Sequence, residues 1–87
     1  MSKYKVKFKN SASKEYRKLP SQIKKRVNVV IDKLADNPRI SGVIKLQGNN
    51  LLYRIRIGDY RLIFEIYDRE LVIKVIRIGH RRDVYQR

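Results

Sequence analysis

Hydrophobic and polar residues alternate strictly near the start of the chain. Tyr4, Val6 and Phe8 are separated by two lysines, and a period of two is typical of a strand with one buried face. The pattern predicts a first strand over Tyr4–Phe8.

The spacing of apolar residues then changes to three and four, which is typical of a helix. Asn10 or Ser11 is the predicted N-cap, because either side chain can accept a hydrogen bond from a free backbone N–H group. Pro20 ends this short helix. Its apolar members are Ala12, Tyr16 and Leu19.

A longer amphipathic helix follows directly. Ser21 is its predicted N-cap, and it ends before Asn37-Pro38, since the residue preceding a proline disfavours helical geometry. The link between the two helices is short, so they form a hairpin that packs on one face of a sheet. The apolar stripe of the second helix consists of Ile23, Val27, Val30, Ile31 and Leu34.

The rest of the chain predicts strands. Residues 39–50 have no sustained period and are predicted to form a loop with a short extended piece at most. The period of two then returns, interrupted at Gly58-Asp59 and again at a tight turn around Arg69. Loops this short require antiparallel neighbours. The three predicted strands are Leu52–Ile57, Tyr60–Tyr67 and Leu71–Ile78.

A two-residue loop at Gly58-Asp59 fixes the register of the first hairpin. Ile57 then faces Tyr60 and Arg56 faces Arg61, so Arg54, Arg56 and Arg61 emerge on the side opposite the core. Like charges directly opposite one another destabilise a strand pair by about 0.2–1 kcal/mol, so their presence suggests a function. The alternative is an ordinary solvated strand face.

The second hairpin supports the same alternation. Pairing Asp68 with Leu71 places Glu65 opposite Lys74, an opposite-charge pair. The chain contains no repeats, low-complexity tracts or linkers. We therefore expect one α+β domain over residues 1–87, of order β-α-α-β-β-β, with a two-helix hairpin on one face of a mainly antiparallel sheet.

Charge indicates the kind of partner. The chain has 22 Lys and Arg against 8 Asp and Glu, a net charge of +14, and phosphate backbones bind such surfaces by counterion release. Nucleic acid or the ribosome is the favoured partner, and an anionic membrane or an acidic protein is the alternative. The side chains expected to contact phosphates without reading sequence are Lys5, Lys7, Lys24, Lys25 and Arg82.

The last predicted strand leads into a cluster of functional candidates. Gly79 is predicted to end the strand, and His80, Arg81 and Tyr85 follow it closely. A guanidinium presents a planar fork of donors to phosphate, and a tyrosine ring can stack on an unpaired base. The alternatives are a surface or capping role for His80 and a sheet-edge anchor for Tyr85.

Several chemistries are disfavoured by the composition. With one histidine and no cysteine the chain cannot build an ordinary zinc site, and its acidic residues are too scattered for a two-metal nuclease centre. We expect no metal and no cofactor. The absence of cysteine and of any membrane-length apolar run favours a cytoplasmic protein.

Several segments follow one another along nearly the whole chain: FKNSASKEYRKLP, ADNPRI, KLQG, LYRIRIGDYRLIFEI and VIRIGHRRDVY. This succession resembles the RelE toxins, the ribonucleases of bacterial type II toxin–antitoxin systems. The resemblance implies cleavage of messenger RNA in the ribosomal A site and silencing by a tightly bound antitoxin.

The resemblance also implies site residues. The catalytic positions it suggests are Arg54, Arg56, Arg61, Arg81 and Tyr85. The first two are lysines in the best-known pattern, and an arginine is a poor proton acceptor, so the general base is open and His80 is one candidate. Two other functions stay open: a DNA gyrase inhibitor of the related ParE branch, and a noncatalytic RNA-binding or ribosome-binding module.

Overall fold

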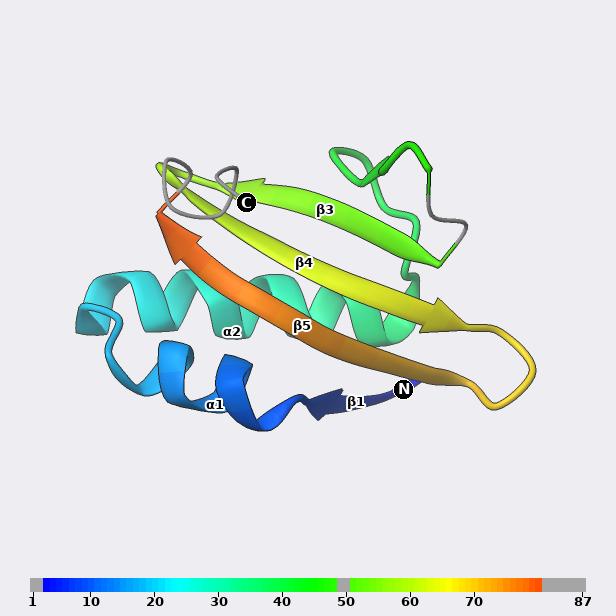
Figure 1. The fold of residues 1–87 in the computed structure, drawn as a ribbon, viewed down its shortest axis with the longest axis horizontal. Coiled ribbons are helices and arrows are strands. Elements are labelled where there is room, and N and C mark those ends of the chain that lie inside the picture. The colour runs from blue at the N-terminus through cyan, green and yellow to red at the C-terminus, as the bar shows by residue number, and fades with distance from the viewer. Residues whose placement is uncertain (1–2, 49–50, 81–87) are drawn as a thin grey trace.

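The fold was analysed in a computed structural model, which describes residues 3–48 and 51–80. It has the predicted α+β class (Figure 1). The elements in chain order are β1 (Lys5–Phe8), α1 (Asn10–Arg17), α2 (Ser21–Asp36), β2 (Ile44–Lys45), β3 (Leu52–Ile57), β4 (Tyr60–Tyr67) and β5 (Val72–His80).

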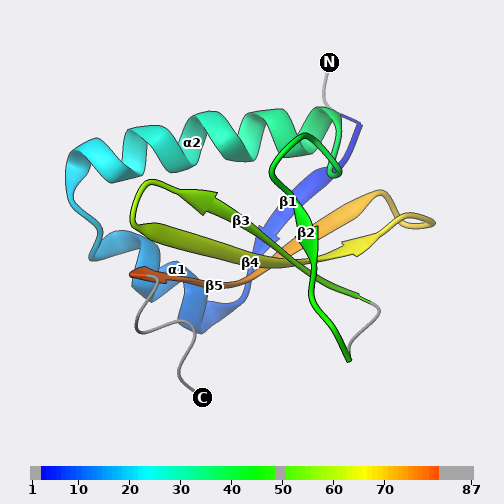
Figure 2. The same cartoon turned by 90° about the horizontal axis from the view of Figure 1, so that it is seen from above.

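The strands form one sheet of order β1-β5-β4-β3-β2. β1 runs parallel to β5, and every other pair is antiparallel. α2 lies across one face of the sheet, behind it in Figure 1, whereas α1 lies beside β5 where β1 ends. Figure 2 shows α2 and the sheet as two layers. In the part of the chain that the structure describes, α2 lies on only one face of this sheet, so the other face carries no long helix.

The predicted register of the first hairpin is confirmed. Ile57 pairs with Tyr60 and Arg56 with Arg61, and Gly58 supplies the positive φ, +61°, that a two-residue loop needs. The predicted pairing of Glu65 with Lys74 is also confirmed.

A single core fills the space between α2, α1 and the sheet. The predicted stripe of α2 faces it: Val27 and Leu34 are buried, and the other members pack against them. Residues of α1 and four strands complete the core, because alternate strand positions point toward the helices. The largest fully buried side chains are Phe64, Leu34, Leu62, Ile73, Ile78, Val27 and Val75.

Both predicted N-caps are wrong: Asn10 and Ser21 each lie one residue after the observed cap, and the alternative Ser11 lies two residues after it. Lys9 caps α1 and Pro20 caps α2, and neither helix has a side-chain cap hydrogen bond. The proline presets the φ value at its own position, so α2 begins at Ser21 without needing the serine hydroxyl as a cap.

The second reversal differs from the predicted two-residue turn. It occupies residues 68–71, and the first strand pair is Tyr67 with Val72. Leu71 adopts a left-handed φ of 57° there, a conformation that is costly for a residue with a Cβ atom.

β5 also continues to His80, so Gly79 does not end the strand. The register shifts between Ile63 and Phe64, which pair with Arg77 and Val75, so Ile76 is an extra, bulged residue. The bulge moves Ile78 onto the core side. Its trace in the sequence is a break in the alternation, because Val75 and Ile76 are adjacent apolar residues and Arg77 stands where the period of two would place the next apolar one.

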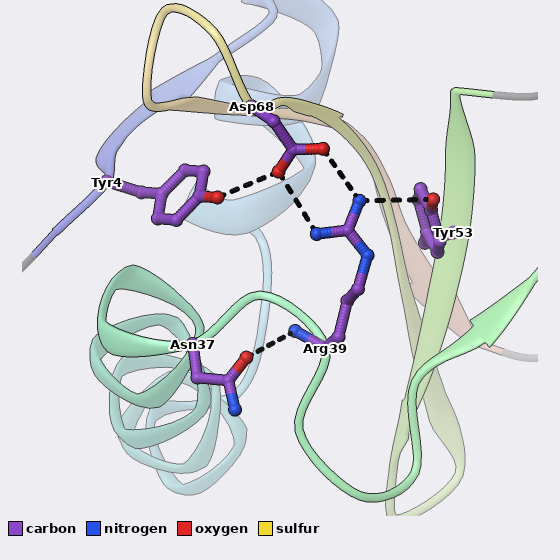
Figure 3. A network of polar contacts seen from close by, with 5 residues as sticks. All are labelled: Tyr4, Asn37, Arg39, Tyr53 and Asp68. Carbon is purple, nitrogen blue, oxygen red and sulfur yellow. Dashed lines mark hydrogen bonds and ion pairs between the residues drawn. The ribbon is translucent and has the colours of Figure 1, made fainter.

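A polar cluster ties the chain between α2 and β2 to the rest of the fold (Figure 3). Arg39 donates two hydrogen bonds to Asp68, at 3.0 and 2.9 Å, and Tyr4 donates a third at 2.8 Å. The Arg39 guanidinium also lies 5.5 Å from the centre of the Tyr53 ring, and the Asn37 side chain accepts from the Arg39 N–H. The bonds from Arg39 and Tyr4 hold the pKa of Asp68 below its ordinary value, and the bond to Asp68 raises the pKa of Tyr4.

Within residues 3–48 and 51–80, no helix has the length and apolar character needed to cross a membrane.

Candidate functional site

Arg54, Arg56 and Arg61 lie on one face of the sheet, opposite α2. Their strand neighbours Ile55, Ile57 and Leu62 are buried in the core, and successive side chains of a strand point to opposite faces. The strand pair β3–β4 sets Arg56 directly across from Arg61, so the side chains of both strands leave the sheet on this face. We call these three residues the arginine face.

The three arginines differ in exposure. Arg56 is exposed, Arg54 is half-buried and Arg61 is only 7% exposed. Arg61 is the one charged residue that is buried among those the structure describes. A guanidinium keeps its charge when it is desolvated, and a charge in a low-dielectric setting attracts an anion more strongly than an exposed one. Arg61 is therefore the arginine of this face that is most shielded from water.

The hairpin loop gathers further positive charge. The Arg56 Nε donates to the Gly58 carbonyl at 3.1 Å, and the Arg26 guanidinium from α2 packs against the same residue. A Cβ atom on Gly58 would lie 2.9 Å from an Arg26 nitrogen. That nitrogen is the end of a flexible side chain that can shift, so the φ of +61° is what favours glycine here. Sequence reasoning missed Arg26, because nothing local in the sequence connects α2 to the loop.

Two residues that pair with the arginines of this face are small or apolar. Gly79 pairs with Arg61 and leaves the position beside it without a side chain. Ile44 pairs with Arg54 and is 48% exposed. A phosphate can bind the guanidinium groups while an attached sugar or base contacts this apolar border.

The acidic group on this face is held away from the arginines. The Tyr67 hydroxyl donates to the Glu65 carboxylate at 2.6 Å, and this bond raises the pKa of Tyr67. Glu65 also pairs with Lys74 on β5. Its negative charge is therefore directed toward Tyr67 and Lys74.

The predicted phosphate-contacting lysines separate into two groups. Lys5 and Lys7 alternate with core-packed residues of β1, which places them on the same sheet face as the arginines but on its far edge strand. Lys24 and Lys25 lie on α2, and the Lys24 Nζ is 5.8 Å from the centre of the Tyr16 ring. Only the first pair can act together with the arginine face.

His80 is not brought together with the arginines. It pairs with Tyr60 across β4 and β5, and the two rings meet edge to face at 5.6 Å. Tyr60 packs against the core, so His80 lies on the helix side of the sheet. Arg81, Arg82 and Tyr85, the other predicted site residues, lie outside the described residues.

No group of three or more His, Cys, Asp or Glu residues that can hold a metal ion occurs in the part of the chain that the structure describes. The chemistry available on the arginine face is charge neutralisation and hydrogen-bond donation toward an anion.

Comparisons with known proteins agree on one family. Residues 6–85 match the family described as the ParE toxin of type II toxin–antitoxin systems. The chain is 36% identical to a RelE-like toxin protein of Escherichia coli, covering 95% of this chain and 90% of that protein. It is 32% identical to the mRNA interferase toxin RelE of Escherichia coli K12, covering 90% and 83%.

Solved structures give the same result. The RelE–RelB complex from Pyrococcus horikoshii matches with a TM-score of 0.81 at 33% identity, over 91% of this chain and 96% of that one. The isolated Escherichia coli RelE toxin matches with a TM-score of 0.80 at 32% identity, over 88% and 83%.

Proposed function

Because the chain belongs to the family of RelE and ParE toxins of type II toxin–antitoxin systems, we propose that it is an endoribonuclease that cleaves messenger RNA in the ribosomal A site. Its relative in Escherichia coli K12 is named an mRNA interferase. The observation that carries the proposal is that Arg54, Arg56 and Arg61 leave β3 and β4 on the same face of the sheet, opposite α2.

Cleavage of RNA through its own 2′-hydroxyl suits such a face. The 2′-oxygen loses its proton and attacks the adjacent phosphorus, negative charge develops on the phosphorane, and the 5′-oxygen leaves with a proton. The substrate supplies the nucleophile, so the protein needs chiefly to orient the phosphate and stabilise its charge. We propose that the reaction proceeds without a metal ion.

The arginines divide this work by their exposure. Arg61 is buried and binds the phosphate through a group whose surroundings are already desolvated. Arg56 is exposed and held by the Gly58 carbonyl, so its remaining donors face the substrate. Arg54 extends the positive surface along the same strand.

The remaining roles belong to the segment after β5. We propose that Arg81 lies near the leaving oxygen and that Tyr85 orients or stacks a nucleotide. The general base is not His80 in this scheme, because its ring packs against Tyr60 on the other side of the sheet. Ribosomal RNA or a group of the substrate takes the proton.

The proposed partners follow from the same surface. Relatives have been solved as complexes with RelB antitoxins, and a cognate antitoxin with an acidic segment would neutralise a chain of net charge +14. The ribosome and the messenger RNA are the targets when the antitoxin is absent.

Mapping of transcript ends after brief expression tests the proposal. We expect cuts at fixed positions within codons of translated messages, and none in the same messages when their start codons are removed. Intact messages in cells that have stopped growing would contradict it.

The second candidate is a DNA gyrase inhibitor, because the matching family is described as the ParE toxin. It predicts loss of plasmid supercoiling in the same cells, with messages left whole. A noncatalytic RNA-binding or ribosome-binding module predicts neither effect.

A further inference from the structure

The end of β5 has an unusual lateral neighbour. β1 accompanies β5 only as far as the pair Phe8–Val75, and the last bond between them runs from the Lys9 N–H to the Val75 carbonyl at 2.9 Å. Beyond that point β5 has β4 on one side and α1 on the other. Its free edge therefore needs other partners, since an unpaired backbone N–H in a partly buried place is costly.

Glu15 of α1 supplies that partner. Its Oε1 accepts a hydrogen bond from the Ile78 backbone N–H at 2.9 Å, and its Oε2 lies 3.4 Å from the Arg77 Nε. The carboxylate is 30% exposed, so both contacts are partly shielded from water. Ala12 and Tyr16 of the same helix pack into the core. They set the rotation of α1 about its axis, and so the direction in which Glu15 points.

These contacts hold the residues that follow the bulge. The extra residue Ile76 puts Gly79, in place of Ile78, opposite Arg61. Without the bulge, Ile78 would stand beside Arg61 on the open face and Arg77 would point into the core. The Glu15 bond engages Ile78 only in the bulged register, in which a glycine and not an isoleucine pairs with Arg61.

We infer that Glu15 is a positioning residue for RNA cleavage. It secures the end of β5 so that Arg61 keeps its place beside Gly79 in the bulged register. The inference rests on the proposed ribonuclease function and adds a residue that does not touch RNA.

The test is steady-state cleavage of a defined message on programmed ribosomes by refolded toxin. We expect Glu15→Ala to lower kcat about 10-fold or more while KM changes less than about 2-fold, because displaced catalytic groups slow the reaction more than they weaken binding. Glu15→Gln keeps an acceptor oxygen for Ile78 but makes a weaker bond, so its kcat should lie between those of Glu15→Ala and the unsubstituted protein.

Asp32→Ala is the matched control. Asp32 is exposed on α2, and its loss changes the net charge by the same amount, so a general electrostatic effect on RNA binding appears in both alanine variants. We expect the control to cleave like the unsubstituted protein.

Amide hydrogen exchange of Ile78 gives a readout independent of activity. It should accelerate in Glu15→Gln relative to Asp32→Ala, while core amides exchange at unchanged rates. A folded Glu15→Ala protein with full kcat would overturn the inference. If that variant does not fold, full kcat and an unchanged Ile78 exchange rate in Glu15→Gln would do so. No cleavage by the unsubstituted protein would refute the proposed function and the positioning role of Glu15 in it. Ile78 exchange would still test whether Glu15 holds the end of β5.

Discussion

Arg61 combines two properties that rarely occur together, a permanent charge and near-complete burial. A group of this kind is expensive to maintain for stability alone. We predict that Arg61→Ala lowers cleavage by about 100-fold or more, the loss typical of removing one preorganised donor from a transition state. The measurement is single-turnover cleavage on programmed ribosomes.

Arg61→Lys separates charge from geometry. It keeps the positive charge but lacks the planar fork of donors, so its rate should lie between those of the alanine variant and the unsubstituted protein. Full activity in a folded Arg61→Ala protein would remove Arg61 from the site.

Leu71 is a second residue whose side chain does not suit its backbone conformation. Its φ of 57° is left-handed and its side chain is 45% exposed, so the leucine gains little from burial while bearing backbone strain. Asparagine tolerates this conformation. We predict that Leu71→Asn raises the free energy of unfolding by about 0.5–1 kcal/mol, measured by urea denaturation, whereas Leu71→Val should lower it.

Between elements, the Asp68 cluster joins the β4–β5 turn, the start of the chain and the loop after α2 (Figure 3). Because the pKa of Asp68 is lower in the folded protein than in the unfolded chain, its contribution to stability is fully present above about pH 4, near the unfolded value. It is lost as the pH falls through the folded value, where the carboxylate takes up a proton.

We therefore predict a pH-dependent effect of Asp68→Asn. At pH 7 the variant should unfold at a lower urea concentration than the unsubstituted protein, and the difference should shrink as the pH is lowered below 4. Glu70→Gln, in the same turn and exposed, is the control. A difference between the two proteins that does not depend on pH would show that the charge of Asp68 is unimportant.

The same element scale shows what the sequence could predict. The register of both hairpins followed from alternation, because a slip by one residue would expose Phe64 and Leu62. The caps, the bulge at Ile76 and the parallel pairing of β1 with β5 did not follow. They depend on contacts between distant segments, as do Arg26 at the hairpin and Glu15 at β5.

For the site, alternation placed three arginines on one sheet face but could not predict which face His80 occupies. In the bulge-free register it would share the arginine side; the bulge reverses the sides after Ile76 and sets His80 beside Tyr60. One extra residue in a strand thus decides which face a histidine occupies.

For the whole molecule, the net charge of +14 makes RNA affinity a function of salt. Each phosphate neutralised on a single strand contributes about −0.7 to the slope of log K against log salt concentration. If Arg54, Arg56 and Arg61 each engage one phosphate, they account for a slope of about −2. We predict that Arg56→Gln weakens binding to a single-stranded RNA oligonucleotide and makes the slope shallower by about 0.7, measured by fluorescence anisotropy between about 50 and 200 mM NaCl.

Lys25→Gln is the control for this measurement. It changes the net charge equally but lies on α2, across the sheet, so the slope of its binding should match that of the unsubstituted protein. Equal changes in both variants would mean that RNA senses only the total charge of the protein, and the arginine face would lose its claim to be the binding surface.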